Sequence, residues 1–455
     1  MTEGATASAP LRGLAEWALE RLKPKASGAD IELYVSRVTE RGIELREGQL
    51  ETLQESVEEG VGLRVIRDGR AGFAFCVGLD LDEVERAFDR VLDQLTFLPP
   101  DPDKVLPAPQ AAADDGIQGS LLEPGLLDAP AQARIDALKT LEAGTLAADR
   151  KVKRVLRGGY GESRGSVAIA STRGVMAYEE ATSCGVSVSA VAEQDAEVQI
   201  GSASSVGRRY ADLDFARVAR EAAYRTVVQL GAKKLPTARR AVVFDPWVAG
   251  EVLELIAGML SADAVQRGRS LLAGKLGRGV GSALATFIDD PRRPGGLASS
   301  LFDAEGVPTR RKISIEAGVV REYFYDASTA AKEGRASNGS AGRGSYKGVP
   351  SPGSSNFYLQ PGTMTRDALI RDTADGILVL ELMGLHTADP VSGEFSVGLS
   401  GVEIKDGKLG AGVRGAMVSG NLLDLLSRLD AVGDDLVFYA GSASPTFRVA
   451  DLTVA

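Results

Sequence analysis

The first hundred residues alternate between helical and strand-like patterns of apolar side chains. Apolar residues recur at helical spacing ahead of Pro24, which predicts the end of a first helix: Leu11, Leu14, Ala15, Ala18 and Leu22. Alternation predicts one strand over 31–35 and a second strand starting near 43–45. Asp68-Gly69 lies between two apolar runs and predicts a hairpin, because Gly adopts the positive φ of a tight turn. A second amphipathic helix is predicted over 81–95.

A proline-rich stretch separates this unit from the next segment of the chain. Residues 97–116 hold five prolines and few large apolar side chains, and we expect an extended connection there. A helix is predicted over 130–148. Residues 152–205 alternate with Gly-rich turns, which indicates several antiparallel strands, and a further helix is expected over 215–230.

The second half opens with a short apolar strand at 241–244, followed by a predicted helix from Pro246 to Ala264. Short strands then recur between Gly, Pro, Asp and Ser, at 312–315, 319–325, 356–359, 376–382, 437–439 and 446–449. A last helix is expected after Asn421, with Leu422, Leu425, Leu426 and Leu429 on one stripe. The predicted fold is therefore α+β: an N-terminal α/β domain with an antiparallel sheet over 1–232, and a β-rich C-terminal domain over 233–455 that holds one buried helix.

Composition narrows the function classes. The chain has 455 residues, a net charge of −10 and 25% charged residues, which is typical of an ordinary globular protein. Its acidity and lack of a basic block disfavour nucleic-acid binding, which uses clustered Lys and Arg. No apolar run is long enough to span a bilayer, and the N-terminus lacks the features of a secretory signal. Only two cysteines, Cys76 and Cys184, are present, so a cytoplasmic protein is expected.

Candidate chemistry is sparse. The single histidine, His386, would have to join both cysteines to form a His/Cys zinc site, or act alone as a general base. Gly161–Gly165 matches the G-x-S-x-G nucleophile motif, but a strand-like run follows it instead of a helix, so Ser163 is expected in a turn. The Gly-rich segments 277–281 and 339–344 lack the frame of a phosphate loop.

Three pairs of adjacent carboxylates could suggest hydrolytic or metal chemistry: Glu179-Glu180, Asp289-Asp290 and Asp434-Asp435. Neighbours on a strand point to opposite faces, so we expect solvated surface charge at all three. Polar loops are the better candidates for a binding surface. The residues chosen on that ground as a substrate-binding surface are Asn338, Arg343, Asn356, His386, Asp389 and Glu394.

Several segments together resemble the PmbA/TldD family, once called modulators of DNA gyrase. They are Leu382–Gly401 with Asp389-Pro390-Val391-Ser392-Gly393-Glu394, Ser355–Gly362, Ser444–Val454 and Glu47–Val65. The resemblance implies a two-domain protein that pairs into a dimer around an internal channel. It also implies that the TldD branch is a zinc peptidase, with H-E-x-x-x-H on a helix of the C-terminal domain and a Cys near the C-terminus.

At the positions that match those ligands, this chain has other residues. Leu253 and Gly258 replace the two histidines, Ala440 in Tyr439-Ala440-Gly441 replaces the cysteine, and Glu254 retains the glutamate. Leu, Gly and Ala offer no lone pair to a zinc ion, so we expect neither a metal nor another cofactor. Glu254 is expected to have a structural partner, since a buried carboxylate must be hydrogen-bonded or ion-paired.

The resemblance therefore implies the PmbA/TldE-type branch, whose members pair with a TldD-like zinc peptidase subunit to degrade or trim unfolded and leader peptides. We expect this chain to supply part of the chamber wall, to form a homodimer when isolated, and to need neither nucleic acid nor membrane. Two alternatives stay open. The chain is a self-sufficient hydrolase that uses His386 at an unrecognised site, or it binds a client such as gyrase on its own.

Overall fold

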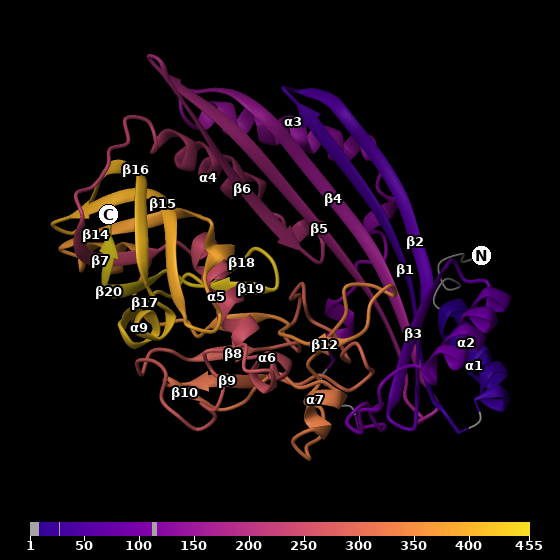
Figure 1. Ribbon diagram of the computed structural model, residues 1–455. Coiled ribbons are helices and arrows are strands. Elements are labelled where there is room, and N and C mark those ends of the chain that lie inside the picture. Colours follow the sequence, from indigo (N-terminus) through magenta and orange to yellow (C-terminus); the bar gives the residue numbers. More distant parts are fainter. Residues whose placement is uncertain (1–8, 27, 112–115) are drawn as a thin grey trace.

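The computed structural model describes residues 9–26, 28–111 and 116–455. Its first half is one large curved sheet of long strands, and its second half packs smaller sheets under the hollow side of that sheet (Figure 1). The fold is mixed α+β, as the sequence predicts.

The N-terminal sheet is antiparallel throughout, with the order β3-β2-β1-β4-β5-β6. β1 lies near its centre and pairs with β2 on one side and β4 on the other. The bounds of its strands are β1 Asp30–Arg46, β2 Gln49–Arg67, β3 Arg70–Val77, β4 Val152–Ser171, β5 Met176–Gln194 and β6 Glu197–Gly207.

Four helices cover one face of this sheet in two pairs. Helices α1 (Ala9–Leu22) and α2 (Leu81–Leu95) pack on one end, where residues such as Leu33 and Phe88 are fully buried. Helices α3 (Ala131–Ala148) and α4 (Phe215–Val227) pack on the other end, around Ile43 and Val188. The opposite face of the sheet is left for the C-terminal half.

The C-terminal half contains a barrel-like sheet with the order β16-β15-β14-β7-β20-β17, which an additional β16–β20 pairing closes. A second sheet has the order β10-β9-β8-β13-β19-β18, and β11 pairs with β12. The bounds are β7 Ala238–Phe244, β8 Phe287–Asp289, β9 Lys312–Glu316, β10 Val319–Val320, β11 Ala341–Gly342, β12 Ser351–Pro352, β13 Phe357–Leu359, β14 Asp375–Met383, β15 Glu394–Lys405, β16 Lys408–Asn421, β17 Leu429–Val432, β18 Val437–Phe438, β19 Ser442–Ser444 and β20 Phe447–Val454.

Helix α5 (Pro246–Met259) lies between these two sheets and is largely buried, with Val248, Val252 and Ile256 in the core. Asp245 caps its N-terminus by accepting a hydrogen bond from the backbone N–H of Trp247. The shorter helices are α6 Ala262–Gln266, α7 Ala327–Ala331, α8 Arg366–Arg371 and α9 Leu422–Ser427. The predicted buried helix is thus present in the C-terminal half.

Several predicted boundaries differ from the structure. The two strands expected around 31–35 and 43–45 are one strand, β1. The helix expected over 246–264 ends at Met259, and α6 begins separately at Ala262. The strand expected over 319–325 is confined to β10. Leu429 belongs to β17 instead of the last helix, because it pairs with Val449.

Among the helices of the described residues, none is both long and apolar enough to cross a bilayer.

Candidate functional site

Two cavities lie between the free face of the N-terminal sheet and the C-terminal half, and a third adjoins them within the C-terminal half. We call the three together the interdomain cleft. The large cavity, of about 700 Å³, lies between β1, β2, β4 and β5 on one side and residues 297–298 and 440–441 on the other. A helix hollow of about 360 Å³ lies beside α5, and a loop hollow of about 240 Å³ lies beyond it. Ala298 lines all three, so the cavities are direct neighbours.

Small residues form the sheet wall of the large cavity. Ser163 is paired with Ser183 and Gly161 with Gly185 across β4 and β5, and Gly42 of β1 lies beside Gly161. Residues two apart on a strand share a face, so these five positions all face the cavity. The wall is therefore close to the backbone over β4 and β5, whereas Glu40 of β1 and Gln54 of β2 add longer polar side chains to it.

The G-x-S-x-G segment is part of this wall and is no nucleophile elbow. Ser163 lies in the middle of the continuous strand β4, so the predicted turn is wrong. Its Oγ is 2.8 Å from the Oγ of Ser183. No helix begins after it, and no base contacts it within the described residues.

On the opposite face of the same strands, a buried ion-pair network stiffens the wall. The side chain of Glu162 is fully buried and accepts hydrogen bonds from Arg41 (2.8 Å), Arg134 (3.3 Å) and the hydroxyl of Tyr160 (2.6 Å). Burial, followed by the hydrogen bond to Glu162, raises the pKa of Tyr160. A buried carboxylate with three donors is satisfied, so this network has a structural role.

The helix hollow contains positions that the resemblance assigns to the lost zinc site. Glu254, Ala257 and Gly258 of α5 line it, opposite Gly441. Leu253 does not line the hollow: it is 1% exposed and packs in the core. Glu254 is exposed, contrary to the expected buried carboxylate with a partner. Ala440 lines the large cavity next to the helix hollow.

These residues do not fit a zinc ion. Catalytic zinc takes three protein ligands with N, S or O donors, and leaves one position open. Of the residues that line the helix hollow, Glu254 alone has an ionisable side chain. Across residues 9–26, 28–111 and 116–455, no three His, Cys, Asp or Glu side chains are grouped to hold a metal ion. The residues that line the helix hollow therefore supply too few ligands for a zinc ion.

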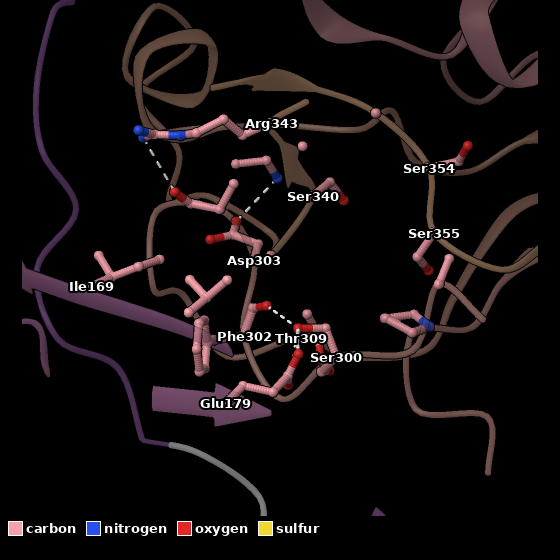
Figure 2. Close-up of a pocket in the computed structure, with 18 of the residues that line it drawn as sticks. Ile169, Glu179, Ser300, Phe302, Asp303, Thr309, Ser340, Arg343, Ser354 and Ser355 are labelled. Carbon is pink, nitrogen blue, oxygen red and sulfur yellow. Dashed lines mark hydrogen bonds between the residues drawn. The ribbon is translucent and has the colours of Figure 1, made fainter. Parts of the chain in front are cut away.

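The loop hollow brings the ends of β4 and β5 against loops of the C-terminal half (Figure 2). The Glu179 carboxylate accepts hydrogen bonds from the Ser300 hydroxyl (3.0 Å) and from the backbone N–H of Leu301. Burial raises the pKa of Glu179. Glu179 therefore joins the two halves, and the expectation that it is solvated surface charge is wrong.

Four buried charged side chains from both halves lie beside this hollow. Glu32 of β1 is 2.5 Å from Arg64 of β2 and 2.6 Å from Arg343. Arg64 also pairs with Glu305 at 2.8 Å. Burial raises the pKa of Glu305 to about 7 and that of neighbouring Asp303 to about 6. Arg343, a predicted substrate-binding residue, lines the hollow while it anchors the two halves to each other.

Asn338 and Asn356, also predicted for substrate binding, are engaged within the C-terminal half. Asn338 accepts a hydrogen bond from the backbone N–H of Tyr325 and donates to Glu322 and Tyr323. Asn356 is fully buried and holds the loop at 290–299, through the carbonyl of Asp290 and the backbone N–H of Ala298. Both arrangements are structural.

Asp289 is 1% exposed, contrary to the expectation of a solvated surface charge. Its carboxylate lies 3.1 Å from Nζ of the fully buried Lys312. It also accepts hydrogen bonds from the backbone N–H (2.6 Å) and hydroxyl (2.9 Å) of Ser355. The hydrogen bonds between Asp289 and Ser355 fix the 353–355 segment, which lines both smaller hollows.

His386 and Asp389 lie on an exposed loop between β14 and β15, and the exposed Glu394 is the first residue of β15. None of the three lines the interdomain cleft. The backbone N–H of Val391 and the hydroxyl of Ser392 lower the pKa of Asp389. Glu394 accepts a hydrogen bond from Asn421 at 3.0 Å. The candidates chosen from polar loops thus separate into an exposed group and a buried group.

Sequence reasoning missed Arg208 as a link between the halves. Its guanidinium is buried beside the large cavity and donates to the carbonyls of Thr182, Gly296, Leu297 and Ser299. Burial lowers its pKa. The sequence Gly207-Arg208-Arg209 contains no signal that the first arginine is buried and the second exposed.

Comparison with known proteins assigns the family. Three models of the PmbA/TldA metallopeptidase family match in order: domain 1 over residues 31–95, the central domain over 124–230 and the C-terminal domain over 237–455. The metalloprotease PmbA of Escherichia coli O157:H7 is 26% identical over 92% of this chain and 90% of its own length. A TldD homolog of Haemophilus influenzae is 26% identical over 89% of this chain and 85% of its own.

Solved structures agree. A protein from Thermotoga maritima described as a candidate modulator of a DNA gyrase superposes with a TM-score of 0.87, at 26% identity over 97% of this chain and 99% of its own. TldE from Thermococcus kodakarensis shares the fold, with a TM-score of 0.89 at 21% identity over 97% of this chain and 100% of its own. On this evidence the chain belongs to the PmbA/TldD metallopeptidase family.

Proposed function

We propose that this chain is a metal-free PmbA/TldE-type subunit that works with a TldD-like zinc peptidase on unfolded or leader peptides. The observation that carries the proposal is the donor set of the helix hollow. Glu254 is its one ionisable group, and the neighbouring positions Ala257, Gly258 and Gly441 offer no side-chain donor. Hydrolysis by a bound zinc ion then requires ligands from another subunit.

The sheet wall of the large cavity supports a role in holding peptide. An extended chain of any sequence needs a surface without bulky side chains, and Gly42, Gly161 and Gly185 supply one. The flanking Ser163 and Ser183 add hydroxyls within reach of a peptide backbone. Such a wall leaves room for the backbone of an extended peptide over β4 and β5.

The relatives support a paired system. Haemophilus influenzae has both a TldD homolog and a PmbA homolog, which are 26% and 25% identical to this chain. The presence of two family members in one organism supports a complex in which one subunit holds the metal and the other completes the chamber.

The test combines the purified chain with the TldD-like protein of the same organism and follows cleavage of an unstructured fluorogenic peptide. We expect no cleavage by the chain alone, and cleavage by the mixture that a zinc chelator abolishes. His386→Ala should leave the mixture unchanged, since His386 is exposed and outside the cleft. Cleavage by the chain alone that is lost in His386→Ala would instead favour a self-sufficient hydrolase.

Size-exclusion chromatography with light scattering completes the test. We expect a homodimer of the isolated chain and a heteromeric complex with the zinc subunit. Binding of gyrase by this chain, with no complex formed with the TldD-like subunit, would favour the stand-alone client-binding role and contradict the proposal.

A further inference from the structure

A pocket of about 350 Å³ outside the interdomain cleft lies where α4 meets the C-terminal half. We call it the arginine pocket. Four arginines line it, three from α4 and one from the start of α8, together with three carboxylates and two tyrosines: Arg217, Arg220, Arg225, Arg366, Glu221, Asp245, Asp435, Tyr224 and Tyr439. Its position at a junction of the two halves and its charge set it apart from the rest of this acidic chain.

The carboxylates of the pocket are fully used by the protein itself. Glu221 accepts from Arg217 through one oxygen, and from Arg225 and the Tyr439 hydroxyl through the other. Asp245 pairs with Arg225 through one oxygen and with Arg366 through the other. The two oxygens of Asp435 accept from the backbone N–H and the hydroxyl of Thr446. No carboxylate oxygen of the pocket, among the described residues, lacks a partner.

The arginines, in contrast, have donors to spare. A guanidinium carries five N–H donors. Arg220 has no hydrogen-bond or ion-pair partner within the described part of the chain, and Arg366 forms one ion pair, at 2.9 Å, with its side chain 34% exposed. Four positive and three negative side chains leave the pocket with a net charge of about +1 in a chain whose net charge is −10. The unused N–H donors and the net positive charge make the pocket suitable for an anionic hydrogen-bond acceptor.

The arginine pocket shares no lining residue with the large cavity, but residues close in the chain line the two. Tyr439 lines the pocket, and the next residue in the chain, Ala440, lines the large cavity. Arg217 donates to the carbonyl of Ser204 at 3.0 Å, and Val206, two residues further along β6, also lines the large cavity. The end of a peptide that lies along the sheet wall would reach the pocket by passing around the edge strand β6.

We propose that the arginine pocket binds the carboxylate of a peptide held in the interdomain cleft. This inference rests on the proposed peptide-binding function and adds a recognition element to it. One carboxylate balances the surplus charge of one, whereas a phosphate group would overcompensate it. Charge-assisted hydrogen bonds from Arg to carboxylate are short and strong, and Arg220 and Arg366 supply the donors. The C-terminal carboxylate and an acidic side chain near the peptide's end share this chemistry.

The experiment measures fluorescence anisotropy of the full chain with three versions of one labelled unstructured dodecapeptide. The first ends in a free carboxylate, the second in an amide, and the third is the amide with Asp at its last position. We expect at least tenfold tighter binding of the first peptide than of the second. The third peptide decides whether a side-chain carboxylate substitutes for the terminal one.

Arg220→Gln should remove most of the preference for the free carboxylate, and Arg220→Gln/Arg366→Gln should abolish it. Because Arg220 is exposed and without a partner in the described residues, the single variant should fold and melt like the wild type. Arg173→Gln is the matched control: Arg173 is exposed, forms no ion pair with any described residue and lies outside the pocket. It should keep the full preference.

Equal affinity for all three peptides would overturn this inference and leave the proposed function intact. The choice of a peptide carboxylate would be overturned if inorganic phosphate bound the full chain more tightly than the carboxylate peptide does, and if Arg220→Gln abolished that phosphate binding. Failure of every peptide to bind, to the chain or to its complex with the zinc subunit, would instead contradict the proposed function itself.

Discussion

The buried carboxylate of Glu305 provides a pH-dependent test of how the two halves are held together. Glu305 belongs to a loop of the C-terminal half and pairs with Arg64 of the N-terminal sheet at 2.8 Å, while the backbone N–H of Ala327 donates to its other oxygen at 2.7 Å. Asp303, Glu32 and Asp326 are the further charged groups that act on it, and burial has the largest effect on its pKa. Glu305→Gln keeps the shape and removes the titration.

The sign and size of the effect come from proton linkage. The pKa of Glu305 rises from an ordinary value of 4.5 to about 7 in the folded protein. Between these values the folded state holds a proton that the unfolded state has released, so the free energy of unfolding falls as pH rises. Each pKa unit corresponds to about 1.4 kcal/mol, so the wild type should lose about 3 kcal/mol across this range because of Glu305.

Urea unfolding at pH 4.5, 5.5, 6.5 and 7.5 measures this loss. Between pH 4.5 and 7.5, the free energy of unfolding of Glu305→Gln should fall by about 3 kcal/mol less than that of the wild type. Glu316→Gln is the matched control, because Glu316 is half exposed and pairs only with Arg321 among the described residues. Parallel pH profiles for wild type and Glu305→Gln would refute the assignment of a raised pKa to this buried ion-pair cluster.

Two further substitutions test the cleft. Leu253→His should lower the free energy of unfolding by about 2–5 kcal/mol, because it places a polar ring in the core, and Leu253→His/Gly258→His should gain no zinc affinity. A zinc-dependent rise in melting temperature would contradict this. Arg208→Met should cost about 3–5 kcal/mol in urea unfolding, because four carbonyls lose their charged donor, whereas Arg209→Met should cost under about 1 kcal/mol. Equal effects of the two would contradict the anchoring role of Arg208.

Local sequence signals predicted the elements whose stability is local. The helix over Leu81–Leu95 has an apolar stripe and an Asp80 cap, and it begins and ends where the pattern does. The hairpin at Asp68-Gly69 is likewise present, with positive φ at both residues. The continuity of β1 was missed, because its middle carries Arg37 and Arg41, whose charges are matched only across strands by Glu59 and Glu162.

The candidate site was harder to predict, because its residues come from segments far apart in the chain. The family pattern pointed to α5, where Glu254 and Gly258 line the hollow, while Leu253 packs in the core. Pairings such as Glu179 with Ser300 form only once the two halves of the chain meet. No periodicity in a single segment encodes such a contact.

The pairing of β1 with β4 limits where the chain can be divided into independently folding pieces. The family models separate residues 31–95 from 124–230, yet β1 and β4 come from opposite sides of that division and are neighbours over the span Glu32–Leu45. Cutting the chain at 97–116 would expose a long bare strand edge on each fragment, and such edges recruit foreign strands. The two sequence modules therefore complete each other's sheet and form a single folding unit.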